Sequence, residues 1–161
     1  MKYFPGRLNI TWIRNCYSDG SLTPRELVGE IIKRAEMTKD KNIWIVPPSR
    51  ELMERYIEKL EKTDVNSLPL WGIPFAIKDN IDLEGVPTTA ACKEYEYVPK
   101  ENAYVVKKLI GMGAIPVGKT NLDQFATGLV GTRSPYGEVH NSLKDELISG
   151  GSSSGSAAAV G

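Results

Sequence analysis

The chain has 161 residues, of which 41% are hydrophobic and 25% charged, the ordinary range of soluble globular proteins. Twenty basic residues balance twenty acidic ones, so no excess of positive charge indicates a nucleic-acid or membrane-surface partner. No apolar run approaches the roughly 20 residues that span a bilayer, and Met1–Arg7 lacks a signal-peptide core. The length suffices for one domain with a buried core.

Cysteine and histidine are too few to suggest a metal or a disulfide framework. Cys16 and Cys92 allow a single disulfide, but two reduced thiols in a cytoplasmic protein are the favoured interpretation. His140 is the single histidine, so a zinc site would depend on scattered carboxylates. We therefore expect no metal site.

The first clear elements are two helices separated by a short strand. The stretch Thr23–Glu26 predicts a helix to about Met37, because it supplies an N-cap threonine, a proline for the first turn and a capping-box glutamate. The apolar run Asn42–Val46 predicts a short buried strand. Ser49 is expected to cap the second helix, whose apolar residues recur at helical spacing. These residues are Leu52, Met53, Tyr56, Ile57 and Leu60.

Short apolar runs then alternate with helical patterns. Leu70–Ile77 and Ala114–Val117 predict strands that are buried on both faces. Between them, Ala103–Met112 predicts a helix that Gly113 ends. This alternation indicates an α/β fold with a largely parallel sheet.

The segment Gly113–Thr120 matches the P-loop pattern in letters but not in context. A P-loop follows a strand and wraps phosphates with backbone amides, whereas this segment follows a helix and contains an apolar strand. Gly118–Thr120 is instead predicted to be a strand-to-helix turn. Asn121 or Asp123 is then expected to cap a short helix through Phe125.

Two segments carry the residue types of a catalytic site. Lys78 ends a buried apolar strand, where desolvation lowers a lysine pKa and makes the amine a potential general base. A salt bridge to Asp79 or Asp82 is the alternative for this lysine. Gly150–Ser156 combines glycines with clustered hydroxyls, which relay protons in some sites and form linkers in others. A Ser-His-Asp arrangement would require His140 as its base.

Three blocks together resemble the amidase signature family, namely Trp71–Asn80, Gly113–Asn121 and Gly150–Val160. The resemblance implies an α/β/α sandwich with a mixed central sheet, of which this chain is the N-terminal part. Residues 1–66 would form a helical N-terminal region and residues 67–161 the start of the signature core. The alanine-rich end of the chain at residues 157–160 predicts the beginning of a buried helix, so we expect the domain to continue past Gly161.

The resemblance also implies a Ser-cisSer-Lys triad without metal or organic cofactor. Lys78 matches the family's lysine, and Ser152 matches the serine that follows a cis peptide bond. The nucleophilic serine and the oxyanion-hole amides would lie downstream of Gly161, so the chain alone is expected to be inactive. Thr127 and Gly128 are expected to line the substrate pocket.

Within the family, Asn121–Gly137 and Pro87–Cys92 look most like allophanate hydrolases. This implies hydrolysis of allophanate to ammonia and carbon dioxide in urea degradation, urea carboxylase as partner enzyme, and a homodimer for the full-length form. Three alternatives remain open: an amidase of another substrate such as the A subunit of glutamyl-tRNA amidotransferase, a non-catalytic fragment, and a nucleotide-binding protein.

Overall fold

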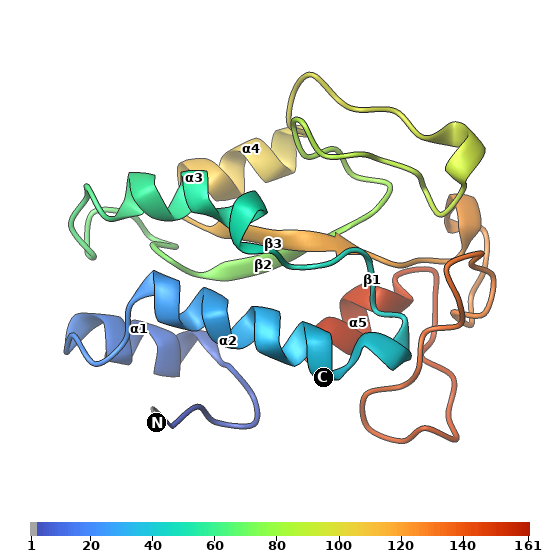
Figure 1. Cartoon of the computed structure of the whole chain (residues 1–161), viewed down its shortest axis with the longest axis horizontal. Helices are drawn as coiled ribbons and strands as arrows, with labels where there is room; N and C mark the ends of the chain where they lie inside the picture. The colour runs from blue at the N-terminus through green and yellow to red at the C-terminus, as the bar shows by residue number, and fades with distance from the viewer. Residues whose placement is uncertain (1–2) are drawn as a thin grey trace.

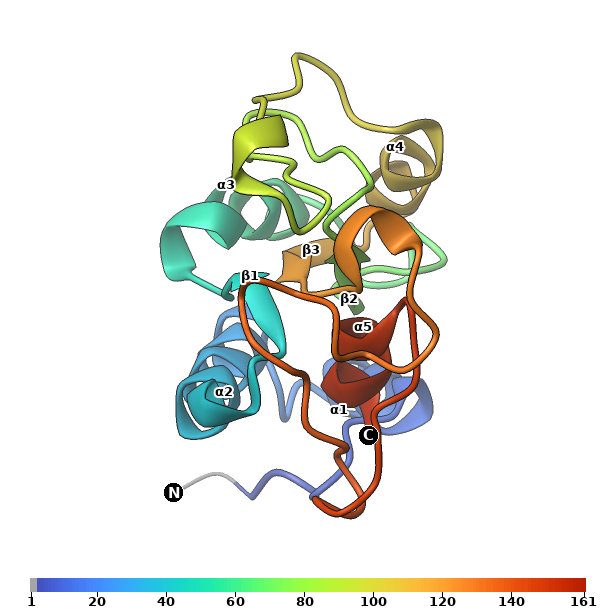
Figure 2. The ribbon, with the colours of Figure 1, turned by 90° about the vertical axis from the view of Figure 1, so that its right-hand side faces the viewer.

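The computed structural model describes residues 3–161 as a three-stranded sheet between two sets of helices (Figure 1). Helices α3 (Arg50–Leu60) and α4 (Tyr104–Gly111) lie on one side of the sheet. Helices α1 (Ile10–Ser18), α2 (Pro24–Met37) and α5 (Ser154–Val160) lie on the other, as the view turned by 90° also shows (Figure 2). Within residues 3–161 no helix is long and apolar enough to cross a membrane.

The sheet is mixed, and its central strand is the last of the three in the chain. Strand β3 (Ile115–Thr120) lies between β1 (Trp44–Val46) and β2 (Pro74–Lys78). It runs parallel to β2 and antiparallel to β1. Every residue of β3 is buried, as a central strand between two layers requires. The mixed sheet agrees with the family resemblance, whereas the expectation of a largely parallel sheet holds only for the β2–β3 pair.

The N-terminal helices follow their capping signals. The Thr23 side chain accepts from the Glu26 amide and the Glu26 carboxylate accepts from the Thr23 amide, which confirms the predicted capping box of α2. Ser49 Oγ accepts from the Leu52 amide and caps α3 as predicted. Helix α1 was not predicted; it begins after Asn9, whose side chain caps the Trp12 amide at 2.8 Å.

Two strand predictions were wrong in their limits. The predicted strand Leu70–Ile77 begins only at Pro74, because the preceding residues form a turn in which Gly72 adopts a φ of +71°. The segment Gly118–Thr120 belongs to β3 rather than to a turn. The predicted helix before Gly113 is confirmed as α4, and that glycine adopts a φ of +92° just beyond it.

The core consists of apolar side chains from both layers against the sheet. On one side, Met53 and Ile57 of α3 pack with Ile115 and Val117 of β3. A second cluster joins α1 and α2 to the turn before β2; it contains Ile13, Tyr17, Leu22, Leu27 and Ile73. Because β1 and α3 come from the first 66 residues and contact β3, that region contributes directly to the sheet and its packing. The division at residue 67 stays a prediction.

Three single-turn 3-10 helices lie in the connections: η1 (Lys39–Lys41), η2 (Lys93–Tyr95) and η3 (Gln124–Ala126). The last replaces the short helix predicted after β3. Neither expected cap acts as one, because Asn121 lies before the N-cap position and the Asp123 side chain makes no capping bond. Phe125 interrupts the turn with a φ of +51°. The Asp123 carboxylate is instead directed toward a later loop.

Candidate active site

The candidate site lies where the two parallel strands end. Lys78 is the last residue of β2 and pairs in register with Thr120, the last residue of β3. The carboxyl ends of parallel strands meet at one edge of a sheet, where open α/β folds commonly bind ligands. The Gly150–Ser156 segment returns to this edge, because α5 packs against both strands.

The structure brings Lys78 and Ser152 together, as the resemblance implied. Lys78 Nζ donates to Ser152 Oγ at 2.8 Å and to Ser153 Oγ at 2.9 Å. Lys78 and Ser152 are half-buried, whereas Ser153 is exposed. The Gly151–Ser152 peptide bond is cis. One lysine amine and two serine hydroxyls therefore lie within hydrogen-bonding distance.

The alternative salt bridge for Lys78 was wrong. The Asp79 carboxylate pairs with Lys119, and Asp82 Oδ1 accepts from Thr88 Oγ1 and from the Tyr97 hydroxyl. His140, the alternative base, is exposed on a loop that bridges to Ile148. The basic side chain that contacts the Ser152 hydroxyl is Lys78.

Two opposing effects act on the Lys78 amine. Desolvation lowers its pKa below the ordinary value, and this is the larger effect. The Asp123 carboxylate acts in the opposite direction, because a nearby negative charge favours the ammonium form. A lowered pKa increases the fraction of neutral amine near neutral pH, which is the form that accepts a proton.

The predicted substrate-binding residues Thr127 and Gly128 lie in the loop after η3. Thr127 is exposed, and its hydroxyl donates to the Gln124 carbonyl at 2.9 Å. Gly128 is buried against Asp123, and a Cβ at this glycine would overlap the Asp123 carboxylate carbon. Close packing against Asp123 therefore explains why residue 128 is a glycine. That Thr127 and Gly128 bind substrate stays a prediction.

Sequence reasoning missed a buried ion pair behind the site. Lys119 and Asp79 both have fully buried side chains, and Lys119 Nζ lies 3.0 Å from Asp79 Oδ1. Nζ also donates to Thr88 Oγ1 at 3.0 Å and to the Pro87 carbonyl at 3.1 Å. Lys119, the lysine of the P-loop-like pattern, therefore lies in a buried strand, and protein groups bind its ammonium. The sequence offers only a lysine and an aspartate at the ends of two apolar runs, a signal too weak to pair them.

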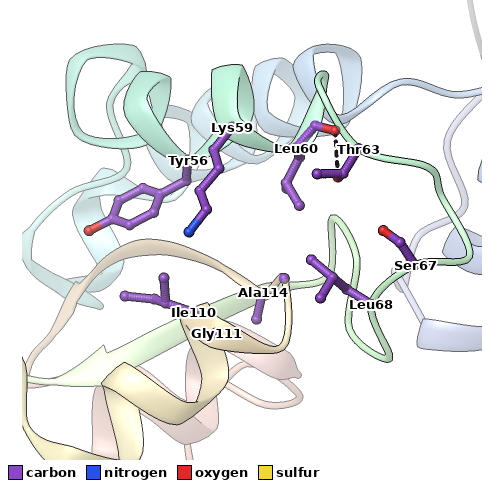
Figure 3. Close-up of a pocket in the computed structure, with 10 residues that line it drawn as sticks. Tyr56, Lys59, Leu60, Thr63, Ser67, Leu68, Ile110, Gly111 and Ala114 are labelled. Atoms are coloured by element: carbon purple, nitrogen blue, oxygen red, sulfur yellow. Dashed lines mark hydrogen bonds between the residues drawn. The ribbon is translucent and has the colours of Figure 1, made fainter.

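An apolar cavity of about 370 Å³ lies at the opposite end of the strands (Figure 3). Its lining includes Leu60 of α3, Ile110 of α4 and Ala114, which precedes β3. Lys78 ends its strand at the other edge of the sheet, so this cavity is not part of the candidate site. Among the described residues, no group of three or more histidine, cysteine, aspartate or glutamate side chains is arranged to hold a metal ion.

Comparison with known proteins finds relatives that match most of this chain. Urea amidolyase of Saccharomyces cerevisiae is 45% identical over 150 residues, which cover 92% of this chain and 8% of the yeast protein. The A subunit of the glutamyl-tRNA(Gln) amidotransferase of Lactobacillus johnsonii is 42% identical over 154 residues, which cover 94% of this chain and 31% of that subunit. The chain thus spans less than a third of either relative.

A solved structure of a Kluyveromyces lactis allophanate hydrolase variant superimposes with a TM-score of 0.82 at 41% identity. The match covers 98% of this chain and 26% of that one. The fold is that of the N-terminal part of the amidase signature domain. The family model described as Amidase matches residues 26–161. The chain therefore belongs to the amidase family.

Proposed function

We propose that this chain carries two of the three catalytic groups of an amide hydrolase, with Lys78 as base and Ser152 as proton relay. The observation that carries the proposal is the 2.8 Å contact between Lys78 Nζ and Ser152 Oγ at the carboxyl end of β2. The lowered pKa of Lys78 supports it, because only a neutral amine accepts a proton.

In the proposed mechanism, Lys78 takes the proton of Ser152 Oγ, and Ser152 takes the proton of the nucleophilic serine. That serine attacks the amide carbonyl, and the C–N bond breaks as Ser152 returns a proton to the leaving nitrogen. Water then hydrolyses the acyl-enzyme along the same proton route. The nucleophile and the oxyanion-hole amides come from a segment downstream of Gly161, so we expect the 161-residue chain alone to be inactive.

We propose allophanate as the substrate, with ammonia and carbon dioxide as products and urea carboxylase as partner enzyme in a cytoplasmic pathway of urea degradation. Two similarities support this choice: the relatives named urea amidolyase and the structure named allophanate hydrolase. The 42% identity to the bacterial amidotransferase supports a second candidate, an amidase that acts on a glutaminyl substrate. Ammonia release from allophanate and from glutamine separates the two. The homodimer implied for the full-length form also belongs to the proposal.

The test uses a longer protein that includes the downstream nucleophile. Lys78→Ala should abolish ammonia release, and Ser152→Ala should reduce kcat by about 10²–10⁴-fold, the range of general acid–base catalysis. Lys107→Ala, on the exposed face of α4, is the matched control and should leave the rate unchanged. Near-normal rates from Lys78→Ala would refute the mechanism. Ammonia release by the 161-residue chain itself, lost in Lys78→Ala, would place the nucleophile within it.

A further inference from the structure

We propose that Asp123 is the positioning residue of this site. Its buried carboxylate binds the loop at residues 128–133 and lies against the Gly151–Ser152 backbone. These contacts hold the Ser152 hydroxyl within hydrogen-bonding distance of the Lys78 amine. This inference rests on the proposed function for its catalytic meaning, but its structural content concerns contacts within this chain.

The Asp123 carboxylate is fully buried and is bound by backbone amides. Oδ1 accepts from the Arg133 amide at 2.8 Å, and Oδ2 accepts from the Gly131 amide at 3.1 Å. Among residues 3–161, no ion pair involves this carboxylate. Hydrogen bonds to a charged acceptor are stronger than neutral ones, so these two contacts hold the loop firmly at the aspartate.

The same residue is in contact with the serine segment through both its main chain and its side chain. The Asp123 amide donates to the Ser152 carbonyl at 3.1 Å. A Cβ at Gly151 would overlap Asp123 Oδ2, and a Cβ at Gly128 would overlap its carboxylate carbon. The carboxylate therefore lies between two backbone segments that only glycine allows to approach so closely.

Asp123 also supplies negative charge to the site. It favours the ammonium form of Lys78 and so limits the effect of desolvation on that amine. Behind this end of the strands, Asp79 and Lys119 neutralise one another in their ion pair, and Asp82, which follows β2, is bonded to Thr88 and Tyr97. Helix α5, which packs over the strands, carries no ionisable side chain. Removal of the Asp123 charge is therefore expected to change the titration of Lys78 in a single direction.

The experiment measures the titration of Lys78 in the 161-residue chain by competitive amine acylation against pH, read by mass spectrometry. In Asp123→Asn, the Lys78 midpoint should fall to lower pH, because a negative charge that favours the ammonium form is lost from the site. Asp82→Asn is the matched control: this carboxylate follows the same strand but is bonded to Thr88 and Tyr97, and its loss should leave the midpoint unchanged. An unchanged midpoint in a folded Asp123→Asn chain would overturn the proposal.

A second measurement needs no variant. Hydrogen exchange of the Gly131 and Arg133 amides in the parent chain should be as slow as that of β3, since both donate to a buried acceptor. Fast exchange of both would overturn the proposal even where Asp123→Asn fails to fold.

In the longer protein, Asp123→Asn should lower kcat and move the pH profile to lower pH with little change in KM. If Asp123→Asn shifts the Lys78 midpoint but the longer parent protein has no amidase activity, only the proposed function is refuted. If the longer parent protein is active but Asp123→Asn does not shift the midpoint, only the role of Asp123 is refuted.

Discussion

Replacement of Lys119 by methionine tests the buried ion pair behind the site. The substitution keeps most of the side-chain volume but removes the ammonium that lies 3.0 Å from Asp79 Oδ1. That oxygen has no hydrogen-bonding partner other than this ammonium, while Oδ2 keeps its bonds from the Thr89 amide and hydroxyl. Breaking one side of a buried pair costs about 3–5 kcal/mol, because an uncompensated charge remains in the core. At roughly 2–4 °C per kcal/mol, the expected fall in Tm is about 6–20 °C.

The assay is urea denaturation followed by circular dichroism, with the free energy of unfolding compared between variants. The double variant Asp79→Asn, Lys119→Met should be more stable than Lys119→Met by at least about 1 kcal/mol, because it also removes the unpaired negative charge of Asp79. Lys107→Met on the exposed face of α4 is the control and should stay within about 0.5 kcal/mol of the parent. A loss below about 1 kcal/mol in Lys119→Met, or no recovery in the double variant, would refute the reasoning.

Three further predictions concern stability. Thr23→Ala removes the capping box of α2 and should lower the free energy of unfolding by about 1 kcal/mol in urea denaturation; no loss would mean that the cap is energetically idle. Gly155→Ala places a Cβ 2.5 Å from the Ile43 carbonyl and should cost about 1–3 kcal/mol, whereas Gly111→Ala, which meets open space, should be neutral or stabilising. Burial raises the pKa of Tyr17, so the free energy of unfolding should fall above about pH 10, where the unfolded phenol ionises, by up to about 1.4 kcal/mol per pH unit. Tyr17→Phe should reduce that slope, and equal slopes would contradict the assignment.

Local signals predicted the helices well because their physics is local. The hydroxyl of Thr23 and that of Ser49 each bond to an amide three residues on, and Gly113 follows α4 with the positive φ that its residue type allows. Helix α1 was missed because its buried residues are only Ile13 and Tyr17, which are too few to show a clear helical period of apolar residues.

Non-local contacts account for what sequence reasoning missed. Strand β3 was predicted to stop before Gly118, because Gly118–Thr120 was interpreted as a strand-to-helix turn. In the structure Lys119 is buried in β3, and its partner Asp79 directly follows another strand. In the same way, Asp123 was assigned a capping role from its position, whereas its carboxylate binds amides eight and ten residues further along. Lys78 and Ser152 were linked in advance through family resemblance, since no periodicity relates residues 74 positions apart.

The order of the strands has a consequence for synthesis on the ribosome. Strand β3 separates β1 from β2, yet it is translated last, so neither earlier strand has its partner until Thr120 has been made. Roughly 70 residues separate β1 from the end of β3, which at about 5–20 residues per second corresponds to about 4–15 s of translation. During that interval the unpaired strand edges of the nascent chain are available to chaperones or to other chains, and the lysine–serine contact forms only after a further segment has emerged.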